Sequence, residues 1–161
     1  MLKGFVFALG AGAIFVWWSS GPLPDIVASN FVADGVANGF MPRRRYVALM
    51  VALTVAVPSV LVSIGRLASH LPTEFVNHPN RQFRLAPERR AAILASLTSF
   101  GAWSGYGCLA FLCLLHWFVV QANLRHPPRL EQPPLVGAAS LLLLGLFCGL
   151  LVVLRRFFRV P

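Results

Sequence analysis

The sequence predicts an all-α integral membrane fold, a four-helix bundle with a structured outer loop between helices 1 and 2. Four apolar stretches are long enough, or nearly so, to cross a bilayer: Phe5–Trp18, Tyr46–Ile64, Thr98–Val120 and Leu135–Leu154. A spanning helix needs roughly 20 mostly apolar residues. In lipid its backbone polar groups must be satisfied within the segment, which makes these stretches helices. The mean hydropathy of +0.71 agrees. We therefore expect a single transmembrane domain over residues 1–161.

The formal net charge of +9 comes from basic residues that flank the apolar stretches. Four spans leave no soluble basic domain to hold nucleic acid, so we exclude a nucleic-acid partner. Cytoplasmic loops carry the excess of Lys and Arg near helix ends. The first and third connections carry five such residues: Arg43, Arg44, Arg45, Arg125 and Arg129. The two termini and the second connection carry nine: Lys3, Arg66, Arg81, Arg84, Arg89, Arg90, Arg155, Arg156 and Arg159. The count predicts a multi-pass protein with both termini in the cytoplasm.

The first connection, residues 21–45, has the signals of a compact loop. Asp34-Gly35 and Asn38-Gly39 are strong turn signals. The apolar residues between them need a surface to cover, so we expect a structured loop that packs on the outer ends of the helices.

The third helix is predicted to be much longer than its apolar stretch. Pro87 followed by Glu88 is a favourable helix start, because the missing N–H costs nothing there and the acid meets the positive end of the helix dipole. A helix from Pro87 to Asn123 would run about 55 Å at 1.5 Å per residue. Its first turns should therefore stand in the cytoplasm or lie along the interface. There the arginines of the second connection would contact anionic lipids, each worth about 1 kcal/mol.

Two pairs of glycines at four-residue spacing mark helix-packing faces. These are Gly101 with Gly105 and Gly145 with Gly149. Glycines at this spacing remove side-chain bulk from one face and let helix backbones approach closely. We expect the third and fourth helices of the chain to pack against each other through these faces. Docking of a face onto a different subunit is the alternative.

His116 is the one histidine inside an apolar stretch. An ionisable group at membrane depth is by default a functional candidate. We expect it to hydrogen-bond to the outer loop, or to Gln121 and Asn123; an interfacial position in water is an alternative. Ligation of a haem or bacteriochlorophyll by His116 is the lesser alternative. No second span supplies a histidine for a haem, and Leu112, one turn earlier, gives no special room for a bacteriochlorophyll ring. No cofactor is therefore predicted, whereas bound lipid is expected.

The sequence gives no sign of catalytic or metal-binding chemistry. Gly-x-Ser-x-Gly, phosphate-binding glycine loops and His-Glu-x-x-His are all absent, and the three cysteines lack Cys-x-x-Cys spacing. The acids, Asp25, Asp34, Glu74, Glu88 and Glu131, all lie in connections, whereas transporters usually place ionisable groups or broken helices near the midplane. We expect a non-catalytic protein with no metal site.

Two motifs in the connections resemble those of a known family. The outer-loop motif comprises Pro24, Asp25, Asn30, Phe31, Gly35, Asn38, Gly39 and Phe40. The cytoplasmic motif comprises Asn77, Pro79, Asn80, Pro87, Glu88, Arg89 and Arg90. They resemble small bacterial four-helix membrane proteins with the domain of unknown function that is found at the N-terminus of Sdp-type toxin-immunity proteins. The resemblance implies the bacterial inner membrane.

The chain departs from that family pattern at four positions of the outer loop. It has Asn30, Val32, Asn38 and Phe40 where the family has His, Asn, Asp and Trp. The titratable groups are replaced, whereas the proline and glycines that shape the loop remain. A loop of this kind is better suited to hydrogen bonding and shape recognition than to holding a metal ion or moving a proton.

These observations predict a non-catalytic subunit of a larger bacterial membrane assembly. It would bind other membrane protein subunits through its helix faces and its outer loop. The family resemblance implies the alternative, an immunity or sensing protein whose outer loop binds a toxin or peptide.

Overall fold

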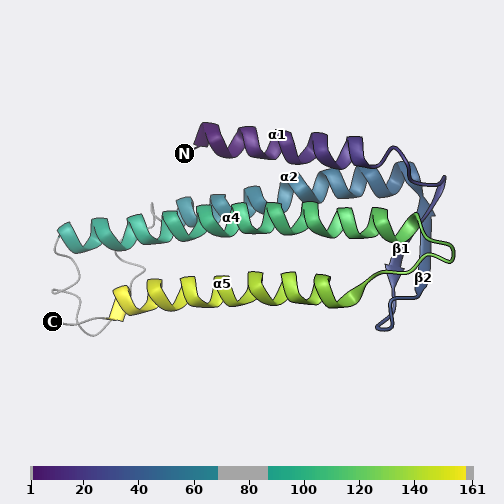
Figure 1. Cartoon of the computed structure of the whole chain (residues 1–161). Helices are drawn as coiled ribbons and strands as arrows, with labels where there is room; N and C mark the ends of the chain where they lie inside the picture. The colour runs from purple at the N-terminus through teal and green to yellow at the C-terminus, as the bar shows by residue number, and fades with distance from the viewer. Residues whose placement is uncertain (1, 69–86, 159–161) are drawn as a thin grey trace.

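The computed structural model describes residues 2–68 and 87–158 of the chain. Four long helices run side by side, and a short β-hairpin crosses one end of them (Figure 1). The elements in chain order are α1 (Leu2–Ser19), β1 (Ile26–Phe31), β2 (Ala37–Pro42), α2 (Arg43–Ala68), α4 (Pro87–Asn123) and α5 (Gln132–Phe158).

All four described helices are long and apolar enough to cross a membrane. Each predicted span lies within one of them. The predicted bounds of the long third helix, Pro87 to Asn123, are those of α4. The first turn of α1 and the last turn of α5 lie away from the hairpin (Figure 1). The start of α1 and the end of α5 therefore lie at the same end of the four helices, opposite the hairpin.

The expectation of an all-α fold is wrong at the outer loop, which forms an antiparallel hairpin. Val27 on β1 pairs with Met41 on β2, and both face the helices, whereas Ile26 and Phe40 on the opposite face are exposed. β2 alternates between half-buried and exposed residues, as a strand with one covered face does, whereas β1 does not, because both Val27 and Ala28 are buried. The register shifts twice, on either side of Asn30.

The helices pack unequally. Helices α2 and α4 approach each other closely where a glycine of one faces a glycine of the other. A Cβ atom added to Gly101 of α4 would lie 2.8 Å from the Cα atom of Gly65 of α2. Helix α1 packs on both of these helices, with Gly12 near Leu109 and Thr54. Helix α5 packs mainly on α4. The architecture is therefore a three-helix core of α1, α2 and α4, with α5 attached along one side of α4.

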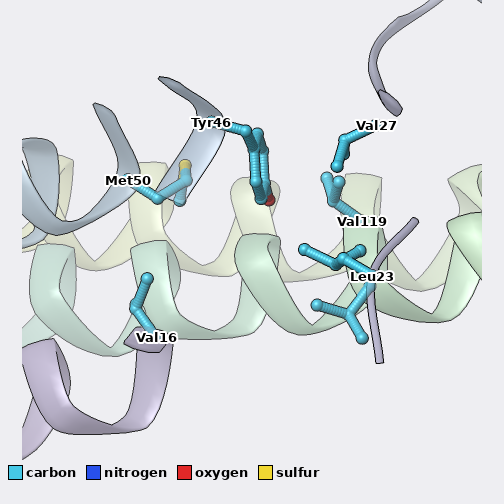
Figure 2. Packing of buried hydrophobic residues seen from close by; sticks show 7 residues of the cluster. Val16, Leu23, Val27, Tyr46, Met50 and Val119 are labelled. Atoms are coloured by element: carbon cyan, nitrogen blue, oxygen red, sulfur yellow. The ribbon is translucent and has the colours of Figure 1, made fainter. Parts of the chain in front are cut away.

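The principal buried apolar cluster lies at the hairpin end, where the three core helices meet β1. Figure 2 shows Tyr46 of α2 between Met50 on one side and Val27 and Val119 on the other. The full cluster comprises Val16, Leu23, Val27, Tyr46, Met50, Val119 and Val120. The hairpin is thus part of the core rather than an appendage.

Candidate functional site

The hairpin turn depends on Gly35. Its φ of 84° lies in the left-handed region that side chains rarely adopt, and its N–H donates to the Val32 carbonyl at 2.8 Å. A Cβ atom at this position would also collide with the carbonyl oxygen of Leu130. The predicted turn at Asp34-Gly35 is therefore confirmed, and it needs glycine for two independent reasons. The turn predicted at Asn38-Gly39 is wrong, because both residues lie within β2.

The second outer connection, between α4 and α5, closes over this turn. The Leu130 N–H donates to the Gly35 carbonyl at 2.9 Å, and the Gln132 side chain donates to the Val32 carbonyl at 2.9 Å. Val36 and Arg129 form an isolated antiparallel bridge. The two outer connections therefore form a single structure, here called the outer cap, made of residues 20–42 and 124–132.

Asn123, the last residue of α4, fastens the hairpin to the helices. Its amide oxygen accepts from the Ala28 N–H at 2.8 Å, and its amide nitrogen donates to the Ala28 carbonyl at 2.9 Å and to the Val119 carbonyl at 2.9 Å. The side chain thus pairs with β1 as a neighbouring strand would. We did not predict this role, although Asn at a helix end next to a loop is the signal that could have indicated it.

The outer-loop motif divides into structural and exposed residues. Gly39 lies against Asn30, since a Cβ atom at Gly39 would come 2.8 Å from that of Asn30. Phe31 is half-buried against the core cluster. The exposed members are Pro24, Asp25, Asn30, Asn38 and Phe40. Arg43 secures the start of the loop by donating to the Leu23 carbonyl at 3.0 Å, with the Asp25 carboxylate 3.9 Å away.

His116 is fully buried at the junction of the three core helices, with 0% of its surface exposed. Its Nδ1 lies 3.0 Å from the Tyr46 hydroxyl, and its Nε2 lies 3.0 Å from the Ser19 hydroxyl and 3.5 Å from that of Ser20. Its ring stacks on Tyr46 at 5.7 Å and meets the edge of Phe15 at 6.3 Å.

The partners of His116 differ from those we predicted. We expected bonds to the outer loop or to Gln121 and Asn123, whereas the bonds go to the hydroxyls of Ser19 at the end of α1, of Ser20 just after it and of Tyr46 at the start of α2. His116 and Asn123 are seven residues apart, about 10 Å along a helix, which is too far for a direct bond. With hydroxyls at both ring nitrogens, the imidazole has the environment of a hydrogen-bonding core residue.

The expected packing of α4 on α5 is present, and Gly149 takes part in it, but the expectation that Gly101 and Gly105 face α5 is wrong. Gly101 and Gly105 face α2, where Gly101 meets Gly65 and Gly105 lies near the Pro58 carbonyl and Val62. On α5, Gly149 meets the ring of Phe100, and Gly145 has no neighbouring atom within 4 Å of an added Cβ. The physical reason is that glycine opposite glycine brings α2 and α4 close together, whereas a phenylalanine keeps α5 away from α4.

A groove of about 600 Å³ lies between α4 and α5. Its walls are almost entirely apolar, with Trp103 and Phe100 on α4 opposite Gly145 and Leu146 on α5. The polar exceptions are serines of α4, among them Ser104. The complete lining is Ala95, Ser96, Ser99, Phe100, Trp103, Ser104, Gly107, Leu141, Leu142, Gly145, Leu146, Gly149, Val152 and Val153.

The cytoplasmic motif is only partly within the described residues. Asn77, Pro79 and Asn80 lie outside them, whereas Pro87, Glu88, Arg89 and Arg90 form the first turn of α4. Within residues 2–68 and 87–158, no three His, Cys, Asp or Glu residues gather where they could hold a metal ion.

Comparison with known proteins adds no identification. No model of a known protein family matches the chain, and neither a curated protein nor a solved structure matches it. The family resemblance of the two motifs therefore stays a prediction, and the function has to be argued from the structure of this chain.

Proposed function

We propose that this protein is a non-catalytic accessory subunit of a larger bacterial membrane assembly, held in the inner membrane with both termini in the cytoplasm. The observation that carries the proposal is how little of α5 the chain itself covers. In the 18-residue apolar segment of α5 that could span a membrane, only 6% of the residues are buried, compared with 33% in the corresponding segment of α4. In lipid there is little hydrophobic drive between helices, so a helix is held by close packing. A span packed mainly on one neighbour is well suited to receive another helix.

The contact surface is the face of α5 directed away from α4. At its outer end this face carries Gly137 and Ser140, both exposed, and an added Cβ at Gly137 would meet nothing within 4 Å. Leu144 and Phe147 continue it, each 58% exposed. A small residue on an exposed apolar helix face is the feature that lets a second helix approach.

The experiment is purification of the tagged protein from its native membrane in mild detergent, followed by mass spectrometry of the co-eluting chains. Wild type should retain one set of membrane proteins in fixed stoichiometry. Gly137→Leu should lose them, because leucine would hold the partner helix off. Leu154→Ala, on the same helix but near its opposite end, is the matched control and should retain them. Purification of the wild type as a single chain would refute the proposal.

The orientation is tested separately by cysteine labelling in intact cells. Ser29 lies in the hairpin, and Ser69 lies in the second connection. In a background without the native cysteines, Ser29→Cys should react with a membrane-impermeant maleimide and Ser69→Cys should not. The opposite pattern would place the termini outside.

The immunity or sensing function is the second candidate, and one observation favours it. Ile26 and Phe40 are 57% and 58% exposed on the outward face of the hairpin, where an apolar peptide could bind. Expression should then protect sensitive cells from a toxin, and the double variant Ile26→Ser/Phe40→Ser should abolish protection while the protein still accumulates. An accessory subunit would give no protection in either form.

A further inference from the structure

The groove between α4 and α5 exists because the two helices are held apart at two points. Leu142 of α5 reaches Gly107 of α4 near one end, and Phe100 of α4 reaches Gly149 of α5 nearer the other. Between these contacts Gly145 has only open space beside it. Trp103, 77% exposed, stands at the rim. A groove of about 600 Å³ is within the range of small-molecule sites, roughly 300–1,000 Å³.

A buried hydroxyl in this groove has no partner. Ser104 is 5% exposed and lines the groove, and within the described part of the chain its Oγ has no hydrogen-bond partner. A serine in a membrane helix can bond to the carbonyl four residues earlier, as Ser59 does to Val55 at 2.6 Å. Ser104 does not do so. An enclosed hydroxyl without a partner costs free energy, so a ligand that brings an acceptor oxygen to it would be favoured.

One arginine lies just beyond the end of the groove that is directed away from the hairpin. Arg155 is exposed and follows Val153, the last lining residue, by two positions. Helical side chains lean towards the N-terminus of their helix, so Arg155 leans towards the groove. Helix α5 contains no Asp or Glu that could neutralise it.

From these observations we infer that the groove binds an anionic phospholipid. Its acyl chain lies along the apolar walls beside Gly145, an ester carbonyl accepts from Ser104, and its phosphate pairs with Arg155. Ten residues separate the levels of Gly145 and Arg155, about 15 Å of helix rise. The long side chain of Arg155 leans towards the level of Gly145 and so shortens this span. A transmembrane helix would fill the apolar walls but would bring no anion to Arg155, and basic pockets between helices are known lipid headgroup sites.

The test uses Trp103 as a reporter at the rim of the groove. A variant with Trp17, Trp18 and Trp117 changed to Phe leaves Trp103 as its single tryptophan. It is reconstituted in phosphatidylcholine vesicles with a minor fraction of brominated phosphatidylglycerol or brominated phosphatidylcholine. Bromine on the acyl chain quenches tryptophan on contact. We expect stronger quenching by the phosphatidylglycerol than by the phosphatidylcholine.

Three substitutions in this background separate the parts of the site. Arg155→Gln should lower the preference for phosphatidylglycerol about fivefold, the equivalent of about 1 kcal/mol for one charge at the surface. Gly145→Leu should reduce quenching by both lipids, since leucine occupies the space of the acyl chain. Gly10→Leu is the matched control, because its added side chain also meets open space but lies on α1, outside the groove, and it should change neither.

Equal quenching by the two lipids in the starting variant would overturn the inference. Quenching that Gly145→Leu leaves unchanged would do the same, because it would mean that lipid does not enter the groove. Native mass spectrometry of the wild type supplies a second readout: retained phosphatidylglycerol supports the site. A dimer without lipid that Gly145→Leu dissociates would mean that a second copy of the chain occupies the groove instead. These results do not depend on the co-purification test at Gly137, so each proposal can fail alone.

Discussion

Replacing Asn123 by Ala should detach the hairpin from the helices while leaving the helices themselves intact. Asn123 is 4% exposed and makes three hydrogen bonds, two of them to the backbone of Ala28, which is 0% exposed. Alanine would leave the N–H and C=O groups of Ala28 buried without partners. Each such group costs about 1–3 kcal/mol, so the docked state should lose at least about 2 kcal/mol.

The loss can be measured by hydrogen–deuterium exchange of the purified protein in detergent. Local opening is what exposes hairpin amides to exchange. A loss of about 2 kcal/mol should accelerate their exchange about thirtyfold. The amides of the helix interiors should be unaffected. Asn38→Ala removes the same amide from an exposed position of the same hairpin and is the matched control.

A near-isosteric variant tests whether the donated bonds matter. Asn123→Asp keeps an acceptor for the Ala28 N–H but loses the donor that serves the carbonyls of Ala28 and Val119. It should accelerate hairpin exchange as Asn123→Ala does. If Asn123→Ala exchanges like Asn38→Ala, the hairpin is held by its apolar contacts alone and the reasoning is refuted.

Three further outcomes are expected. Gly35→Ala should lower the midpoint of thermal unfolding in detergent by more than Gly39→Ala. The added Cβ at Gly35 has to tolerate a positive φ and collides with a backbone oxygen, whereas the added Cβ at Gly39 contacts only a side-chain carbon. The reverse order would contradict the turn assignment. Gly101→Leu should prevent accumulation of folded protein, since it would force α4 from α2; recovery of wild-type amounts would show that this contact is dispensable. Tyr46→Phe should cost about 1–3 kcal/mol in an unfolding titration by leaving His116 without its Nδ1 partner, and an unchanged midpoint would show that this bond contributes nothing.

The helices were predictable because their signals are local. Apolar stretches of membrane-spanning length and the Pro87-Glu88 start are read from adjacent residues, and α4 has the predicted bounds. The turn at Gly35 was predictable for the same reason. Strands β1 and β2 were not, because neither six-residue segment alternates apolar and polar residues along its sequence.

The contacts between helices were harder to predict than the helices. A pair of small residues four positions apart indicates a packing face but does not indicate which helix packs on it. Gly65, the partner of Gly101, is the one glycine of α2 and so forms no such pair with another glycine. The hydroxyls around His116 come from two other helices, and their arrival at one point depends on how α1 and α2 are rotated about their axes.

The order of synthesis imposes a consequence on the outer cap. Ala28 and Asn123 are 95 positions apart, as are Gly35 and Leu130. At about 5–20 residues per second, the hairpin leaves the ribosome roughly five to twenty seconds before its anchors. During that interval Val27 and Ala28 have no helix α4 to cover them. The hairpin should therefore acquire its protection only after α4 and the connection that follows it have been synthesised, so that closure of the cap reports that the chain up to Gln132 is in place.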